Sequence, residues 1–270
     1  MSATMQPVSP SHAAPASVLE AAGVMLRYPG QPRPVVEGFD FALEPGETVS
    51  LLGPSGVGKS SLLRVLGGLQ KPTDGAVTMN GVPLQGVPPR VSIAFQDASL
   101  LPWLSLEKNV AFGLNFKHQP RLSSEASKAR VDVAIREVGL AHARRQFPAQ
   151  LSGGMAQRAA LARCLAREPE ILLLDEPFGA LDEITRTEMQ HLLLKVVRNF
   201  RTAAILITHD IDEALLVSDR ILLLGGAPAR TIGNWRIDLP KPREDYIAEL
   251  GAIRVEILST LRSAAQRRIN

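Results

Sequence analysis

Residues 53 to 60 read Gly53-Pro54-Ser55-Gly56-Val57-Gly58-Lys59-Ser60, which matches the glycine-rich pattern of a phosphate-binding loop. An apolar strand pattern at residues 48–52 precedes this loop and an apolar helix pattern follows it, whereas an ordinary glycine-rich turn requires neither. Glycines let backbone N–H groups turn toward phosphates, and the helix N-terminus adds its positive dipole end. We expect Lys59 to reach the β and γ phosphates and the Ser60 hydroxyl to bind Mg²⁺. The eight residues, together with Ser61, form the candidate nucleotide-binding loop.

Two carboxylates close a second informative run, Ile171-Leu172-Leu173-Leu174-Asp175-Glu176. Four apolar residues in succession are typical of a buried parallel strand, which delivers polar groups at the sheet edge where ligands bind. Asp175 is suited to the Mg²⁺ shell, and Glu176 to orienting or deprotonating an attacking water. The alternative is that both carboxylates only cap the following turn. Combined with the phosphate-binding loop, the pair favours ATP hydrolysis.

The order of strand and helix patterns predicts an α/β fold. Short strand-like runs occupy residues 18–95, and helical periodicity replaces them between residues 100 and 167. Strand patterns return at residues 171–174, 203–207 and 221–224, and an amphipathic helix pattern between the first two predicts a parallel βαβ unit. We therefore expect a P-loop nucleoside triphosphatase fold with a parallel-sheet core, an N-terminal antiparallel β region and an inserted helical subdomain.

Composition divides the 270-residue chain further. Residues 1–17 are rich in Ser, Pro and Ala with almost no charge, which predicts a disordered tail. We expect the nucleotide-binding domain at residues 18–235, with the helical subdomain at about 98–166, and a helical extension at 236–270. No apolar run reaches the length of about 18 residues that spans a bilayer, which predicts a soluble, cytoplasmic protein. The single cysteine, Cys164, has the context of a buried apolar residue and fits a reducing compartment.

The string Leu151-Ser152-Gly153-Gly154-Met155 resembles the signature motif of the ABC ATPases, usually LSGGQ, and the resemblance extends from about residue 16 to residue 225. Ser152 is a good N-cap, and the glycines leave backbone N–H groups unobstructed at a helix start. In that family the motif binds the γ-phosphate held by the P-loop of the opposite subunit. The resemblance therefore implies a head-to-tail homodimer with two ATP molecules. Met155 departs from the usual Gln at a position that faces phosphate less directly.

Other positions match further motifs of that family. Tyr28 resembles the aromatic residue that stacks on adenine, and Gln96 resembles the glutamine that contacts Mg²⁺ and the water shell. Asp182, which ends the string Gly179-Ala180-Leu181-Asp182, would bridge the two subunits, and His209 matches the switch histidine that contacts the γ-phosphate and helps hold Glu176. The alternative for Tyr28 is an ordinary strand aromatic, and for Gln96 it is a polar strand end. For His209 the alternative is a surface residue or a satisfied core residue.

Three function classes compete: the energising subunit of a transporter, a soluble ABC ATPase acting on nucleic acid or the ribosome, and a P-loop kinase or GTPase. The third class lacks the signature string, and an Asn-Lys-x-Asp motif for guanine is absent. Each motif occurs once and no long coiled coil separates them, which argues against the second class and against a nucleic-acid partner. Residues 100–110 resemble the importer segment that receives a permease helix, with Trp103 as an exposed anchor or, alternatively, a core residue.

A transporter function implies two separate permease subunits, an extracytoplasmic solute-binding protein and a peripheral place on the cytoplasmic face of the inner membrane. Residues 95–103, 151–158 and 175–182, with the segment Leu239 to Arg243, most resemble the nitrate, sulfonate and taurine branch of ABC importers. We expect an aliphatic sulfonate as the solute. Nitrate, taurine and thiamine-precursor pyrimidines are the alternatives.

Overall fold

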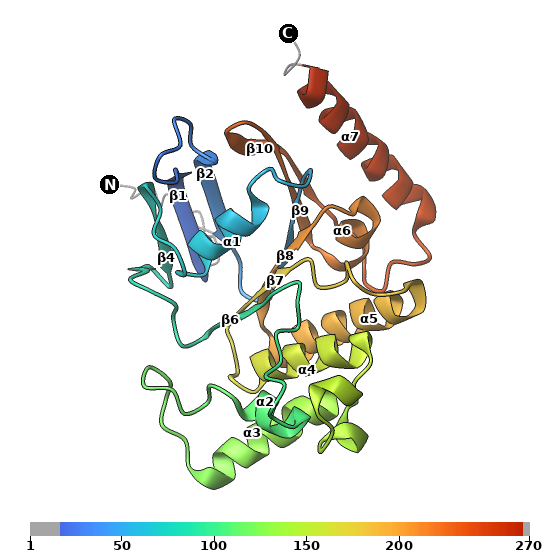
Figure 1. Ribbon diagram of the computed structural model, residues 1–270. Helices are drawn as coiled ribbons and strands as arrows, with labels where there is room; N and C mark the ends of the chain where they lie inside the picture. Colours follow the sequence, from blue (N-terminus) through green and yellow to red (C-terminus); the bar gives the residue numbers. More distant parts are fainter. Residues whose placement is uncertain (1–16, 267–270) are drawn as a thin grey trace, which may run out of the picture.

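The computed structural model describes residues 17–266, so the predicted tail lies outside the described residues except for Ser17. Figure 1 shows one large sheet with helices packed around it. The strands are β1 (Leu19–Leu26), β2 (Val36–Leu43), β3 (Thr48–Leu52), β4 (Asp74–Met79), β5 (Val82–Pro83), β6 (Val91–Ala94), β7 (Ile171–Asp175), β8 (Ala203–Thr208), β9 (Arg220–Gly226) and β10 (Ala229–Arg236). The α-helices are α1 (Lys59–Leu66), α2 (Leu106–Ala111), α3 (Ser124–Glu137), α4 (Gly153–Leu165), α5 (Glu183–Phe200), α6 (Ile211–Val217) and α7 (Ile247–Gln266).

The parallel half of the sheet follows the order β9, β3, β8, β7, β6, and each neighbouring pair in it is parallel. All five residues of β3 are buried, as expected of a strand covered on both faces. α5 lies between β7 and β8 in the chain, and these strands pair in parallel. The predicted βαβ unit and the α/β fold class are therefore confirmed.

Side chains of β7 alternate between the two faces of the sheet. Ile171 and Leu173 pack in the core cluster that contains the buried leucines of α1, whereas Leu172 and Leu174 pack with the buried residues of α3, α4 and α5. An extended strand points successive side chains to opposite faces. The strand that carries the acidic pair is thus fixed by apolar packing from both sides.

The other half of the sheet is largely antiparallel. β1 pairs antiparallel with β2 and β4, and β4 pairs with β5. The hairpin of β9 and β10 joins the two halves, because Ala229 of β10 pairs with Val36 of β2. The expected N-terminal antiparallel region is confirmed. β10 was not predicted, since its residues, which are exposed or half-exposed except for Ala229, give little apolar alternation.

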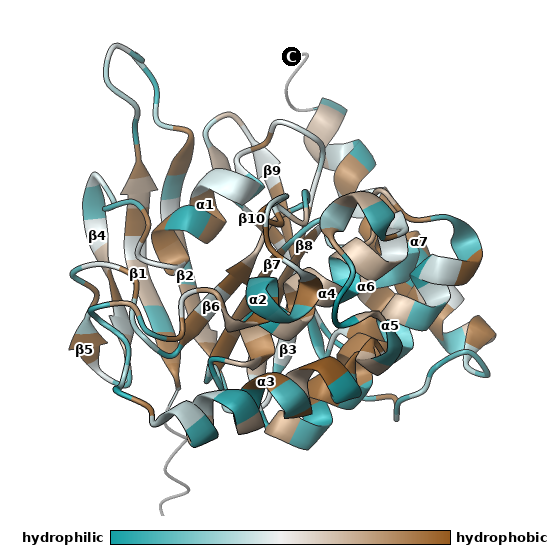
Figure 2. Cartoon of the chain, turned by 60° about the horizontal axis from the view of Figure 1, so that its bottom comes forward, coloured by the Kyte–Doolittle hydropathy of each residue, from teal (hydrophilic) through white to brown (hydrophobic). Residues whose placement is uncertain are grey.

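Helices α2, α3 and α4 follow β6 and precede β7, and they contact one another. The apolar stripe of α3 is buried as predicted, through Val131, Ala134 and Ile135. Figure 2 shows hydrophobic colour on the central strands, whereas α3 carries hydrophilic segments along its length. Cys164 of α4 is buried, and burial raises the pKa of its thiol to about 11. It is an inert core residue, as predicted.

The C-terminal helix α7 packs against α6, β9 and β10. Leu250 and Ile257 are buried in this contact, and Ile253 and Leu261 are partly buried beside them. The predicted amphipathic helix is confirmed. Among residues 17–266, no helix combines the length and the apolarity needed to cross a membrane.

Candidate functional site

Three neighbouring strands bring the predicted site residues to one edge of the sheet. The P-loop follows β3, Asp175 ends β7 with Glu176 directly after it, and His209 follows β8. The registers pair Leu52 with Thr208, and Asp175 with Ile207. The carboxyl ends of parallel strands lie at the same edge, where open α/β sheets bind ligands. Residues more than 150 positions apart in the chain therefore share one site.

The P-loop needs glycine at its base and at its end. A Cβ on Gly53 would lie 2.6 Å from the carbonyl oxygen of Leu224, and one on Gly58 would lie 2.8 Å from Cγ1 of Val35. Gly58 also has a φ of +111°, in the left-handed region that other residues rarely adopt. The exposed residues of the loop are Pro54, Ser55 and Gly56, and Val57 is half-buried.

Lys59 begins α1 and is almost fully buried. Its Nζ donates hydrogen bonds to the carbonyl oxygens of Gly53, at 2.7 Å, and Pro54, at 3.0 Å. Burial lowers the pKa of Lys59, while the carboxylates of Glu176 and Asp175 raise it. The ammonium group is thereby held inside the loop, close to the acidic end of β7.

Ser60 and Asp175 face each other across the loop. The Ser60 hydroxyl donates a hydrogen bond to Oδ1 of Asp175 at 3.0 Å. Burial raises the pKa of Asp175, and the bond from Ser60 opposes this effect. No cluster of three or more His, Cys, Asp or Glu side chains suited to a metal occurs among residues 17–266. A hydroxyl beside a carboxylate suits Mg²⁺, which takes few protein ligands and fills its shell with phosphate and water oxygens.

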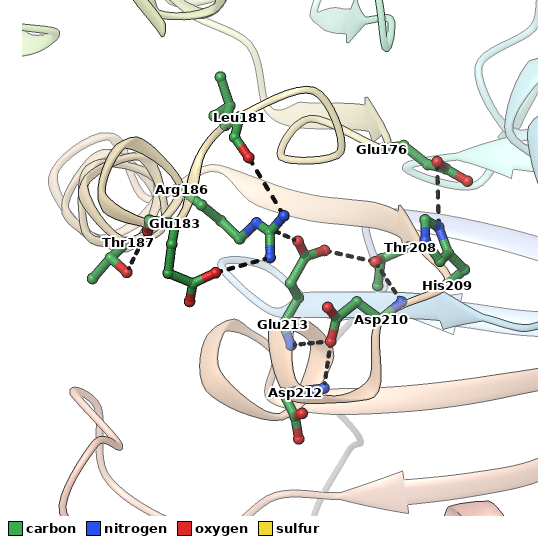
Figure 3. Close-up of polar contacts among 10 residues, drawn as sticks. All are labelled: Glu176, Leu181, Glu183, Arg186, Thr187, Thr208, His209, Asp210, Asp212 and Glu213. Carbon is green, nitrogen blue, oxygen red and sulfur yellow. Dashed lines mark hydrogen bonds and ion pairs between the residues drawn. The ribbon is translucent and has the colours of Figure 1, made fainter.

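Glu176 lies against His209, as predicted. Oε2 of Glu176 is 3.4 Å from Nδ1 of His209, and Figure 3 shows the two side chains pointing toward each other. Glu176 has a φ of +47°, a conformation that costs energy for a residue with a Cβ. Its N–H donates to the carbonyl oxygen of Ile207 at 3.0 Å, which anchors this turn to β8.

Gln96 lies near the acidic pair and is also tied to α4. A Cβ on Gly179 would lie 3.8 Å from Nε2 of Gln96 and 3.7 Å from Oε2 of Glu176, so both side chains flank this glycine. The carbonyl oxygen of Gln96 accepts a hydrogen bond of 2.6 Å from Nε2 of Gln157 in α4. Gln96 thus connects the site to the inserted helices.

Ser152 caps α4 by accepting a hydrogen bond of 3.2 Å from the N–H of Met155. Gly153 and Gly154 form the first turn, and a Cβ on Gly154 would lie 2.4 Å from Cγ2 of Thr185 in α5. Glycine is therefore required there for the close approach of the two helices. Met155 packs against the hydrophobic core, so its replacement of the usual Gln has a structural role.

Asp182 caps α5 in the same way as Ser152 caps α4. Its carboxylate accepts hydrogen bonds from the N–H of Thr185, at 3.0 Å, and from its hydroxyl, at 2.7 Å. These two bonds lower the pKa of Asp182. Within the part of the chain that the structure describes, neither Ser152 nor Asp182 forms a hydrogen bond with a P-loop residue.

Tyr28 lies beside the first turn of α1, where its hydroxyl is 3.0 Å from Oγ of Ser61 and 3.4 Å from Oε1 of Gln70. It is half-buried, so the ring is placed next to the nucleotide-binding loop. Trp103 is 70% exposed, and the alternative that it belongs to the core is wrong. Buried Leu106 and Val110 fill the core at this point instead.

Sequence reasoning missed a polar network beside His209, which Figure 3 shows. Glu213 of α6 accepts a hydrogen bond from Thr208 and is paired with Arg186 of α5. One signal was available, because Asp210 caps α6 and Glu213 follows it by three residues, a spacing typical of helix starts. Nothing in the pattern pointed to Arg186, since its contact requires α5 and α6 to meet.

Comparison with known proteins agrees with this geometry. The profile of the ABC transporter family matches residues 36–179. The aliphatic sulfonates import ATP-binding protein of Burkholderia lata is 47% identical over 222 residues, which cover 82% of this chain and 79% of the relative. The taurine import ATP-binding protein of Chromobacterium violaceum is 44% identical over 220 residues, 82% of this chain and 83% of the relative. A dimeric ATP-binding cassette, solved in a post-hydrolysis state with ADP and Pi, has a TM-score of 0.72 at 29% identity, covering 82% of this chain and 100% of that one.

Proposed function

The chain belongs to the ABC transporter family of ATP-binding subunits, and on that premise we propose that it hydrolyses MgATP to power uptake of an aliphatic sulfonate. It is an ATPase of an importer. The observation that carries the proposal for the chemistry is the convergence of Lys59, the Ser60–Asp175 pair and the Glu176–His209 pair on one sheet edge. For the solute, support comes from relatives named for aliphatic sulfonates and for taurine, which is itself a sulfonate.

The P-loop binds the triphosphate through its backbone N–H groups and the Lys59 ammonium, which lies within the loop. Tyr28, beside Ser61, stacks on the adenine. Ser60, Asp175 and Gln96 would hold Mg²⁺, whose charge would offset that of the phosphates. Ser61 supports this arrangement by fixing the Tyr28 hydroxyl.

Glu176 and His209 prepare the hydrolytic water. The Glu176 carboxylate orients the water and accepts its proton as the oxygen attacks the γ-phosphorus, while the bond from that phosphorus to the β,γ-bridging oxygen breaks and ADP leaves with the bonding electrons. His209, 3.4 Å from that carboxylate, keeps it in place and donates a hydrogen bond to the γ-phosphate. Gln96, on the other side of Gly179, completes the polar surroundings of the water.

Ser152, Gly153 and Gly154 act on the nucleotide of a second copy of the chain. Two features support this arrangement: the unobstructed helix start at Ser152, and the lack of hydrogen bonds from it to P-loop residues among residues 17–266. A homodimer then encloses two ATP molecules, with Asp182 at the subunit boundary. The solved relative of similar fold is likewise dimeric and holds ADP and Pi.

The transporter requires membrane partners, which we propose are two permease subunits and, indirectly, an extracytoplasmic solute-binding protein. The exposed Trp103, on the segment before α2, supports a permease contact at the cytoplasmic face of the membrane. We propose residues 18–235 as the ATPase domain, residues 98–166 as its helical subdomain and residues 236–270 as an extension. Nucleic acid has no part in this function.

Growth on defined sulfur sources tests the solute. Deleting the gene should abolish growth on an alkanesulfonate as the only sulfur source, while sulfate still supports growth. The wild-type gene should restore growth, and a gene carrying Glu176→Gln should not. Growth failure on taurine alone would assign taurine, which is the second candidate because of its named relative. A defect on nitrate or a pyrimidine precursor with normal growth on sulfonates would refute the sulfonate assignment.

A further inference from the structure

Glu213 is a buried carboxylate, 6% exposed, that lies outside the predicted catalytic set. Its Oε2 accepts a hydrogen bond of 2.7 Å from the Thr208 hydroxyl, and its Oε1 is 3.6 Å from Nε of Arg186. Burial raises the pKa of Glu213; the bond from Thr208 and the charges of Arg186 and His209 oppose this effect, while Asp210 adds to it. A buried carboxylate is costly unless it is paired, so its position depends on these neighbours.

One side of this network holds the backbone around His209. The Thr208 hydroxyl accepts a hydrogen bond of 3.0 Å from the N–H of Asp210, so the residues before and after the histidine are joined. Asp210 also accepts from the N–H of Glu213 at 3.2 Å. The His209 backbone is therefore fixed to the first turn of α6, while its ring remains exposed toward Glu176.

The other side of the network reaches the loop that ends in Asp182. Arg186 donates a hydrogen bond of 3.4 Å to the carbonyl oxygen of Leu181 and pairs with Glu183 at 3.3 Å. Leu181 immediately precedes Asp182, which we place at the boundary with the second subunit. Figure 3 shows the continuous line of contacts from Leu181 through Arg186 and Glu213 to Thr208.

We propose that Glu213 and Arg186 are positioning residues that couple the Asp182 loop to His209. When the second subunit fixes that loop, the Arg186–Glu213 pair holds His209 in the position that supports Glu176. Neither residue touches nucleotide. This inference rests on the proposed function, and it adds a physical link between subunit contact and the assembly of the hydrolytic site.

The contact between Thr208 and Glu213, beside His209, is tested by the rate of phosphate release from the purified chain over a range of ATP concentrations. Thr208→Val and Glu213→Ala should each lower kcat about tenfold while KM for ATP stays within about threefold, because the P-loop contacts remain. Thr208→Ser keeps the hydroxyl and should retain near wild-type kcat. Glu213→Gln keeps an acceptor for Thr208 but loses the charge that faces Arg186, so an intermediate kcat is expected.

A double-variant cycle tests the coupling to the Asp182 loop. Arg186→Met should lower kcat, and the double variant with Glu213→Ala should be no worse than the poorer single variant, because both remove one link. The matched control is Asp212→Asn, next to Glu213. Its exposed carboxylate pairs with Arg254 at 2.9 Å on the side of α7, and kcat should stay within about twofold for that surface pair.

Folded Glu213→Ala and Thr208→Val proteins with wild-type kcat would overturn the inference. So would a loss of kcat that only matches a loss of ATP-binding stoichiometry, since that outcome indicates damaged folding. If Glu213→Ala does not fold, the comparison of Thr208→Val with Thr208→Ser decides. A wild-type chain without ATPase activity, or a fully active Glu176→Gln variant, would contradict the proposed function instead, so the two failures are distinguishable.

Discussion

Arg243 offers a sharp test of how the C-terminal extension is attached. Arg243 is 1% exposed, and its guanidinium donates to four main-chain carbonyl oxygens. Two of them, of Leu215 and Ser218, lie at the C-terminal end of α6, and two, of Ile237 and Leu239, lie in the segment after β10. Burial lowers the pKa of Arg243, with Asp219 opposing this effect, but an arginine remains charged at neutral pH.

Arg243→Met keeps a long apolar stem and removes every donor. The carbonyl oxygens of Leu215 and Ser218 then lose their buried partner, and each unsatisfied group costs about 1–3 kcal/mol, or about 4 kcal/mol for the two. In a domain of this size, such a loss lowers Tm by about 8–16 °C. Arg243→Lys should lie between the two proteins, because it keeps the charge and loses the planar fork of donors.

Thermal unfolding followed by circular dichroism, with amide exchange of residues 214–218, measures this effect. Arg254→Met is the matched control, since its half-exposed guanidinium pairs with Asp212 at the surface and contributes about 0.5 kcal/mol. If Arg243→Met melts within about 2 °C of the wild type and its α6 amides stay protected, the reasoning is refuted. The hydrogen bonds of the buried arginine would then contribute nothing measurable to the free energy of unfolding.

Glu176→Gln should bind MgATP but barely hydrolyse it, because the attacking water is not activated. Light scattering should therefore detect an ATP-bound dimer, and a variant that stays monomeric at saturating ATP would contradict both the role of Glu176 and the proposed dimer. Lys59→Ala should lose ATP binding in equilibrium titration, since its charge serves ground and transition states alike. Mixing Lys59→Ala with Ser152→Arg chains should recover some ATPase activity through one rebuilt composite site, and a mixture as inactive as either parent would count against action in trans. Asp175→Asn should raise Tm at neutral pH while abolishing hydrolysis, because burial raises the folded-state pKa and makes the ionised carboxylate unfavourable. The gain in Tm should fade as the pH falls through the folded-state pKa of Asp175 toward its unfolded-state pKa. A change in Tm that is independent of pH would exclude ionisation of Asp175 as the cause.

Local sequence patterns predicted the elements that carry the chemistry. The strand at residues 48–52 and the P-loop after it need only a short apolar run and glycines in fixed places, and β3 has the predicted bounds. The acidic end of β7 and the apolar stripe of α3 were predicted for the same reason. The approach of Glu176 to His209 was expected only from the resemblance to the ABC ATPases. The two side chains meet because β7 and β8 are neighbouring parallel strands, whose carboxyl ends lie together.

Which distant side chains meet depends on how the helices and strands pack against one another. Gly154 must be glycine because Thr185 of α5 lies against it, and Arg186 reaches Glu213 because α5 and α6 pack together. Trp103 is exposed although its neighbours are apolar, because other side chains fill that core. Periodicity reports which face of an element is buried, but it does not say which element covers that face. The chemistry of each strand end could therefore be predicted from local residue patterns, whereas the contacts that hold and couple those ends arise from packing between elements far apart in the chain.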